Sequence, residues 1–155
     1  MLETNLIIRR AFALLVGLTL MGIVGCQPQQ ISSSMEAKNV VDRFYLALKN
    51  KDLEGASNFF KDTVARPASS WFEQLKEVTE KLGDLQSHEI ASELTNTVYS
   101  GQRYTIKVKT QYTKFHATET LVLFEGVSDN VIQIEAWIVN SRGLRGESAD
   151  DAAAP

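Results

Sequence analysis

The chain contains one cysteine, Cys26, and a thiol can act as a nucleophile, a metal ligand or the attachment point of a thioether-linked lipid. Cys26 follows an uncharged, mostly apolar run, residues 11–24, which Arg9 and Arg10 precede. The run is shorter than the ~20 residues that a membrane-spanning helix needs. It has the length of a signal-peptide core, roughly 7–15 residues. The pattern therefore predicts an export signal; the open interpretations are a signal that ends at a lipid-bearing cysteine, an ordinary secretory signal and an uncleaved anchor helix.

The four residues Ile23-Val24-Gly25-Cys26 resemble the lipobox of bacterial lipoproteins. The resemblance implies a diacylglyceryl group on the Cys26 sulfur, cleavage between Gly25 and Cys26, and acylation of the new N-terminus by a fatty acid such as palmitate. Stable anchoring takes more than one acyl chain, each buried CH₂ contributing ~0.8 kcal/mol, and a lipobox cysteine carries two or three. The implied location is the bacterial cell envelope, with the membrane as a partner. Gln27 stands where an Asp would signal inner-membrane retention, so a Gram-negative cell would hold the protein in the outer membrane, facing the periplasm.

A lipidated Cys26 would leave the mature chain without a free thiol, which excludes a disulfide, a thiol nucleophile and a Cys-ligated zinc site. The whole chain has 16 Lys and Arg against 19 Asp and Glu, which argues against nucleic acid as a partner. No His/Asp/Glu cluster has metal-ligand spacing, and phosphate-loop and serine-nucleophile motifs are absent. The sequence therefore predicts no metal, no cofactor and no catalytic residue.

Composition divides the chain into four parts. Residues 1–25 are the expected signal peptide, and the polar residues 26–34 the expected flexible tether. Residues 35–140 form the expected folded domain. Residues 141–155 have few large apolar groups and are expected to be a disordered tail.

Helical periodicity dominates the first half of the domain. Residues 35–49 predict an amphipathic helix with an apolar face formed by Val40, Val41, Phe44, Tyr45 and Leu48. Asp52 is expected to cap a short second helix. Ser70 is expected to cap a third helix, and Gly83 to end it.

After Gly83 the period changes to two, which predicts strands over residues 90–99, 104–112, 116–125 and 131–139. Pairing Tyr112 with His116 across a three-residue turn places Lys109 opposite Glu119, an attractive cross-strand pair. The inner face would then carry Tyr104, Ile106, Val108, Val122, Phe124, Ile132, Ile134 and Ile138.

Helices followed by an antiparallel meander predict an α+β fold. The segment VVDRFYLALKNKDLEGA at residues 40–56 and IEAWIV at residues 134–139 resemble the first helices and the last strand of NTF2-like (cystatin-like) domains, in particular small uncharacterised lipoproteins of that superfamily. The resemblance implies three N-terminal helices on a curved antiparallel sheet of about four strands, with a cone-shaped cavity between them and dimerisation through the sheet.

Some NTF2-like enzymes, such as ketosteroid isomerases, place Asp, His or Tyr side chains inside the cone. The residues of this chain expected at a pocket are Tyr45, Trp71, Tyr104, Tyr112 and His116. No general base with an oxyanion donor can be assembled from them, and tyrosines are common core residues. We therefore expect a non-enzymatic domain that binds a partner protein or a small ligand. The alternative is a small isomerase or hydrolase that uses His116 or Tyr45.

The predicted register leaves an apolar outer sheet face. Its candidate interface residues are Leu121, Leu123, Trp137 and Val139. Such a face predicts self-association as a homodimer or contact with an envelope protein, centred on Trp137. The alternatives are coverage by the C-terminal tail, or the scattered apolar exposure that is normal on protein surfaces.

Overall fold

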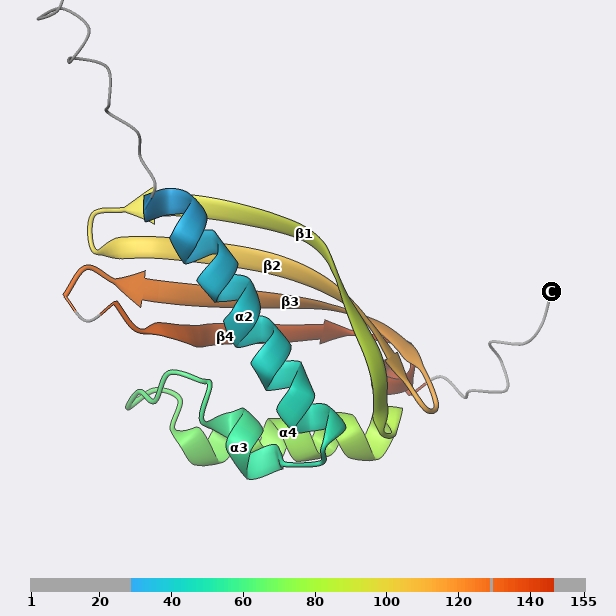
Figure 1. The fold of residues 1–155 in the computed structure, drawn as a ribbon. Helices are drawn as coiled ribbons and strands as arrows, with labels where there is room; N and C mark the ends of the chain where they lie inside the picture. The colour runs from blue at the N-terminus through green and yellow to red at the C-terminus, as the bar shows by residue number, and fades with distance from the viewer. Residues whose placement is uncertain (1–28, 129, 147–155) are drawn as a thin grey trace, which may run out of the picture. The chain divides into compact units, whose positions relative to one another are not determined.

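The computed structural model describes residues 29–128 and 130–146, with side chains from Ser33 onward. The chain divides into two units, Met1–Ile31 and Ser32–Pro155, and the fold below is that of the second. Its elements are α2 (Gln29–Lys49), α3 (Leu53–Ser57), α4 (Ala68–Leu82), β1 (Leu85–Val98), β2 (Gly101–Tyr112), β3 (His116–Gly126), β4 (Ile132–Asn140) and the 3₁₀ helix η2 (Gly143–Arg145). The fold is α+β, with three helices and a curved, unclosed, four-stranded antiparallel sheet (Figure 1).

Helix α2 begins at Gln29, so the end of the predicted tether is helical. The predicted cap of α3 is confirmed, because the Asp52 carboxylate accepts from the Gly55 amide at 2.8 Å. The predicted Ser70 cap is wrong. Helix α4 begins earlier, after Pro67, and the Ser70 hydroxyl donates to the Pro67 carbonyl instead. Gly83 ends α4 with a positive φ of 89°, as predicted.

The β2–β3 register differs by one residue from the prediction. Tyr112 donates its amide to the Phe115 carbonyl at 2.9 Å, which closes a two-residue loop in place of a three-residue one. Gln111 therefore pairs with His116, and Val108 with Glu119. A shift of one residue moves every side chain of a strand to the other face. Glu119 thus lies on the inner face, whereas the outward expectation for it is wrong.

Strand β4 contains a bulge that changes its alternation. Leu123 pairs with Ile134, but Val122 pairs with Ala136, so an extra residue lies between these pairs. As a result Ile134 and Trp137, three positions apart, are both buried. The prediction that Ile138 faces inward is wrong; Ile138 is 60% exposed.

A single hydrophobic core fills the space between the helices and the inner sheet face. Phe44 of α2 packs at its centre, with edge-to-face contacts to Tyr45, Phe60 and Trp137. The residues after β4 join this core, because the Ser141 hydroxyl donates to the His116 carbonyl and Leu144 packs against buried residues. The expected tail is therefore ordered at its beginning, while residues 147–155 lie outside the described residues.

Candidate functional site

The most unusual group in the domain is the carboxyl of Glu119, which is fully buried in the middle of β3. Four hydrogen bonds reach it. Its Oε1 accepts from the Thr110 hydroxyl at 2.7 Å and from the Tyr112 hydroxyl at 2.9 Å. Its Oε2 accepts from the Tyr45 hydroxyl at 2.9 Å and from the Trp137 indole N–H at 2.5 Å. We call these five residues the Glu119 cage.

Three elements build the cage around β3. Thr110 and Tyr112 are alternate residues of β2, so both face inward beside Glu119. Tyr45 reaches down from the buried face of α2. The β4 bulge turns Trp137 inward, and its indole completes the set. Every donor is itself buried, so the carboxyl is sealed from solvent.

Burial raises the pKa of Glu119, because a charge in a low-dielectric interior loses its hydration. The four hydrogen bonds oppose this rise but do not cancel it. The pKa of Tyr45 and that of Tyr112 are also raised, first by burial and then by the adjacent Glu119 carboxylate. The cage therefore resists ionisation, and its tyrosines remain hydrogen-bond donors at neutral pH.

A second polar pair lies beside the cage, nearer the surface. The His88 ring stacks on the Tyr45 ring with centroids 4.6 Å apart, and its Nε2 lies 2.9 Å from an Asp42 carboxylate oxygen. The contact with Tyr45 is between ring faces, so it provides no path for a proton to Glu119. Asp42 is exposed, as its place on the polar side of the helix predicts.

The structure brings four of the five candidate pocket residues into the core, but only two of them into the cage. Tyr45 and Tyr112 are cage donors. Tyr104 donates to Glu125 at the other end of β2, and Trp71 stacks on Phe60 with ring centroids 4.2 Å apart. These side chains fill the interior.

The expectation that His116 faces inward is wrong: His116 is exposed. It opens β3, and the one-residue register difference places it on the outer side with Thr118.

Three of the four candidate interface residues are also misplaced by the predicted register. Leu121, Leu123 and Trp137 are buried in the core, so the expectation that they lie on an exposed outer face is wrong. Val139, opposite Glu119 on β4, faces the helices and is partly buried.

Glu119 was not among the candidate site residues expected from the sequence. Its signal was present, because Glu119 is in phase with Leu121 and Leu123, whereas the alternate positions begin with two threonines.

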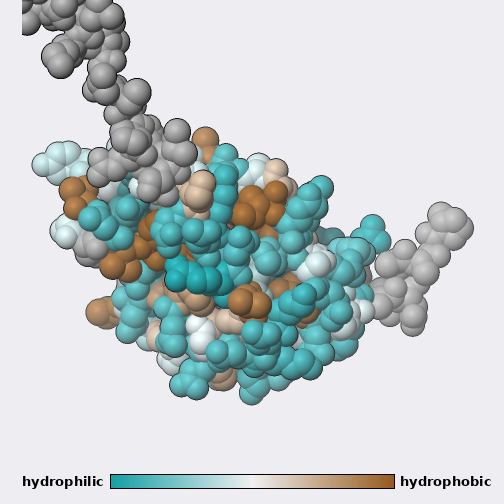
Figure 2. Space-filling view, viewed as in Figure 1, coloured by the Kyte–Doolittle hydropathy of each residue, from teal (hydrophilic) through white to brown (hydrophobic). Residues whose placement is uncertain are grey.

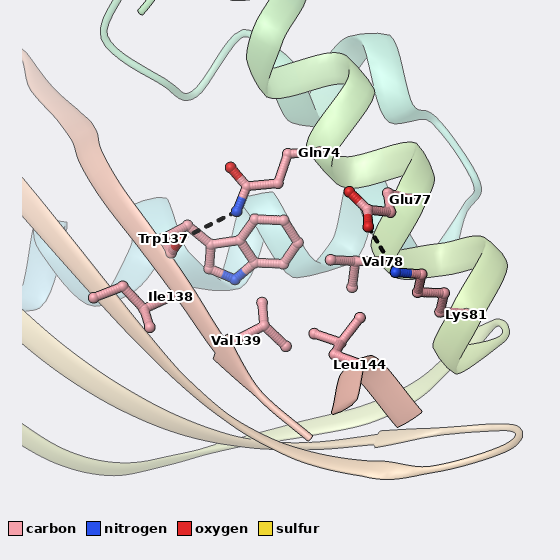
Figure 3. A pocket seen from close by; sticks show the side chains of 8 residues that line it. All are labelled: Gln74, Glu77, Val78, Lys81, Trp137, Ile138, Val139 and Leu144. Carbon is pink, nitrogen blue, oxygen red and sulfur yellow. Dashed lines mark hydrogen bonds and ion pairs between the residues drawn. The ribbon is translucent and has the colours of Figure 1, made fainter. Parts of the chain in front are cut away.

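A groove of about 300 Å³ lies between α4, β4 and η2. Figure 3 shows that Val78, Val139 and Leu144 form its apolar wall beside the Trp137 indole. Its polar rim comes from one face of α4. There Glu77 and Lys81 form an ion pair at 2.7 Å, and the Gln74 amide lies 3.4 Å from the Trp137 carbonyl oxygen. Ile138 completes the lining. Trp137 thus belongs to both the groove and the cage.

The chemistry of the two places differs. The cage holds the only strongly perturbed carboxyl among the described residues, but no reacting atom can reach it. The groove is open and apolar with a polar rim, which suits binding.

Among the described residues, no three His, Cys, Asp or Glu side chains form a group that could hold a metal ion. No described helix is long and apolar enough to cross a membrane. Gly25 and Cys26 lie outside the described residues.

Comparison with known proteins places the chain by fold alone. No protein-family model matches it, and no curated protein matches it in sequence. A solved structure from Catenulispora acidiphila is similar, with a TM-score of 0.55 and 16% identity over 77% of this chain and 99% of that one. The structure of Bd1075 from Bdellovibrio bacteriovorus shows a TM-score of 0.48 and 13% identity. The chain covers 39% of that protein's length, and 68% of this chain is covered. The chain therefore shares an α+β fold with the Catenulispora protein, whose curved-sheet architecture it resembles.

Proposed function

We propose that this protein is a lipid-anchored bacterial envelope protein whose NTF2-like domain binds a small ligand without catalysing a reaction. The observation that carries the binding function is the contrast between the sealed Glu119 cage and the open groove beside it. In an enzyme of this architecture the perturbed carboxyl should meet substrate. Here four side chains occupy every approach to it.

The groove is the binding site in this proposal. Its volume of about 300 Å³ lies at the small end of the range for ligand pockets. Val78, Val139 and Leu144 would bury an apolar body, and the Glu77–Lys81 pair would contact a polar group at the rim. The Glu119 cage would hold the Trp137 wall of the groove in place through its 2.5 Å hydrogen bond.

Other features of the chain support the lipid anchor and the NTF2-like domain. The lipobox-like residues 23–26 support a lipid on Cys26, and the three helices on a curved sheet are consistent with an NTF2-like domain. The exposed position of His116 speaks against an isomerase or hydrolase that uses His116 inside the cone, and the burial of Tyr45 in the Glu119 cage speaks against one that uses Tyr45.

Native mass spectrometry of the full chain, extracted gently from bacterial membranes, tests the binding function. We expect a small molecule to remain bound to the wild type. Val139→Trp should fill the groove and abolish the bound mass, whereas Leu46→Trp, at a 56% exposed position on α2 that does not line the groove, should retain it. A bound mass that survives Val139→Trp, or a wild type with nothing bound, would contradict the proposed site. A second protein at fixed stoichiometry, lost with Val139→Trp, would replace the small ligand by a partner protein.

The intact mass of the same sample tests the anchor. We expect the mature chain to begin at Cys26 and to carry the mass of attached acyl chains. The Cys26→Ala variant should show neither the cleavage nor the added mass. An unmodified wild-type mass would refute the lipid anchor.

A further inference from the structure

Exposed apolar side chains gather at one end of the sheet, where two connections turn side by side. Tyr99 and Val98 lie at the β1–β2 turn, and Val127 and Val131 lie in the β3–β4 connection. Tyr99 is 106% exposed and Val127 71% exposed. Figure 2 shows hydrophobic residues on the surface at this end of the molecule, among others over the visible face. We call these four residues the hairpin end.

The two turns of the hairpin end are joined to each other. The Val127 amide donates to the Ser100 carbonyl at 3.2 Å, and Gly101 pairs with Gly126 across β2 and β3. At Gly101 the Cβ of any other residue would lie 2.0 Å from the Glu125 carbonyl oxygen, so the strands are held closely together here. The apolar side chains are therefore presented by two turns that are hydrogen-bonded to each other.

The first turns of α2 lie near this end. The Ser34 hydroxyl donates to a Glu93 oxygen at 2.6 Å, and the Lys38 ammonium lies 2.8 Å from the other. Glu93 lies on β1, five residues before Val98. Two more exposed apolar residues, Met35 and Leu94, flank this contact at 61% and 58% exposure. The chain therefore enters the domain beside the hairpin end.

The distance along the chain then limits where a lipid on Cys26 can lie. Ser33 is the seventh residue after Cys26. Seven residues span at most about 25 Å even when fully extended. A lipid surface that held Cys26 would thus lie within about 25 Å of Ser33.

The composition of the hairpin end suits a lipid surface rather than water. Residues 94–102 around the β1–β2 turn, LTNTVYSGQ, contain no charged side chain, and residues 126–131 of the β3–β4 connection contain one, Asp129, so little charge would have to be desolvated on contact. Tyrosine is a preferred residue at the membrane–water interface because its ring is apolar and its hydroxyl stays hydrated. A contiguous exposed apolar surface on a soluble domain generally marks an interaction site.

We propose that the hairpin end rests on the membrane surface, with Tyr99 and Val127 in the interfacial layer. This contact rests on the proposed lipid anchor and adds an orientation to it. The sheet would stand on its β1–β2 and β3–β4 turns. Strand β4 begins at Ile132, beside the β3–β4 turn, and its far part, from Trp137 to Val139, lines the groove. The groove would therefore open away from the lipid.

Fluorescence quenching in vesicles tests this orientation. The full-length lipidated chain, as wild type, Tyr99→Trp or Leu46→Trp, is reconstituted in phosphatidylethanolamine and phosphatidylglycerol vesicles with or without brominated acyl chains. Leu46 is the matched control, because it is 56% exposed, does not line the groove and lies near the C-terminal end of α2, away from the turns (Figure 1). The emission added by Tyr99→Trp should fall by roughly half or more when bromines lie about 5–10 Å below the headgroups. Leu46→Trp should be quenched no more than the wild type, whose Trp71 and Trp137 are buried.

The intact mass of each sample tests the lipid anchor separately from the membrane contact of the hairpin end. A lipidated Tyr99→Trp protein without extra quenching would overturn the membrane contact and leave the anchor standing. A sample without acyl chains would refute the anchor and the contact together. Equal quenching of Tyr99→Trp and Leu46→Trp would overturn the orientation, because it would mean that no particular end faces the lipid.

Discussion

Replacing Glu119 tests whether the cage stabilises the fold. Glu119→Leu nearly preserves volume but removes the acceptor of all four hydrogen bonds. Glu119→Gln keeps one oxygen and replaces the other by an amide nitrogen, which donates. The two variants therefore differ in how many buried donors they leave unsatisfied, and that number sets the expected loss of stability.

The magnitude follows from the geometry of the donors. In the Leu variant, Thr110 keeps a second acceptor on β3 at 3.4 Å, whereas Tyr45, Tyr112 and Trp137 lose their partners. Three unsatisfied buried donors cost roughly 3–9 kcal/mol at about 1–3 kcal/mol each. In the Gln variant the amide oxygen can accept from Tyr45 and Trp137, and the NH₂ can donate to the two hydroxyls. One hydroxyl proton then lacks an acceptor, which costs roughly 1–3 kcal/mol.

Urea unfolding followed by far-ultraviolet circular dichroism measures these losses on the detergent-extracted full chain. We expect wild type to be the most stable, Glu119→Gln intermediate and Glu119→Leu the least stable. A domain of this size has a total stability of about 5–15 kcal/mol, so the Leu variant should be near unfolding. A Leu variant as stable as wild type would refute the reasoning. It would mean that the desolvation of the carboxyl costs as much as its hydrogen bonds contribute.

The same carboxyl predicts a pH dependence. Because burial raises the folded-state pKa of Glu119, the folded protein holds this proton more tightly than the unfolded chain does. The contribution of Glu119 to stability is fully present below its unfolded-state pKa of about 4.3. It is lost as pH rises toward the folded-state pKa. The pKa shift of Glu93 has the opposite sign to that of Glu119. Burial raises its pKa, but hydrogen bonds from Lys38 and Ser34 outweigh burial and lower it, so its contribution is lost only as pH falls below about 4.3. The stability advantage of wild type over Glu119→Gln should therefore shrink as pH rises above about 4.3; a constant difference would contradict the raised pKa.

Two matched pairs of substitutions give further predictions. The Trp71 indole N–H is buried without a hydrogen-bond partner among the described residues, so Trp71→Phe should change stability by less than about 1 kcal/mol, because lost contact area and the removed donor offset each other. Trp137→Phe removes a donor to Glu119 and should cost about 2 kcal/mol or more; equal losses in urea unfolding would argue against the cage. Gly101→Ala should cost at least about 2 kcal/mol, since its Cβ would collide with a backbone oxygen at a φ of 154°. Gly146→Ala, with a φ of 82° and nothing within 4 Å among the described residues, should cost only about 1 kcal/mol; a larger shift of the thermal midpoint for Gly146→Ala would contradict this order.

The sequence predicts the elements of this fold better than their register. The period-two pattern of β2 correctly places Tyr104, Ile106, Val108, Thr110 and Tyr112 inside, because both strand neighbours and the helices cover that central strand. On β3 both faces carry apolar residues, so alternation alone leaves two registers open. The attraction of Lys109 to Glu119 favours the wrong one. That surface pair would be worth less than about 1 kcal/mol, too little to compete with burying Leu121 and Leu123.

The candidate site could be predicted only in part for the same reason. Tyr45 and Tyr112 are recognisable as inward residues of their own elements, without reference to a partner strand. The inward positions of Glu119 and Trp137 depend on how neighbouring strands pair, which the two-residue β2–β3 loop and the β4 bulge determine. A bulge adds one residue to one strand only, and neither its position nor its presence follows from a period-two pattern.

The cage also bears on the lifetime of the folded protein. Its donors are 7 to 74 positions from Glu119 along the chain, so they converge only after α2 has docked and β2, β3 and β4 are in register. Interactions that form after the folding barrier slow unfolding and leave the folding rate nearly unchanged. We therefore expect cage substitutions to speed up unfolding, so that folded protein is lost faster over hours, while the refolding rate stays the same. In the proposed envelope location, far from cytoplasmic chaperones, the protein would then depend on one carboxyl for its persistence.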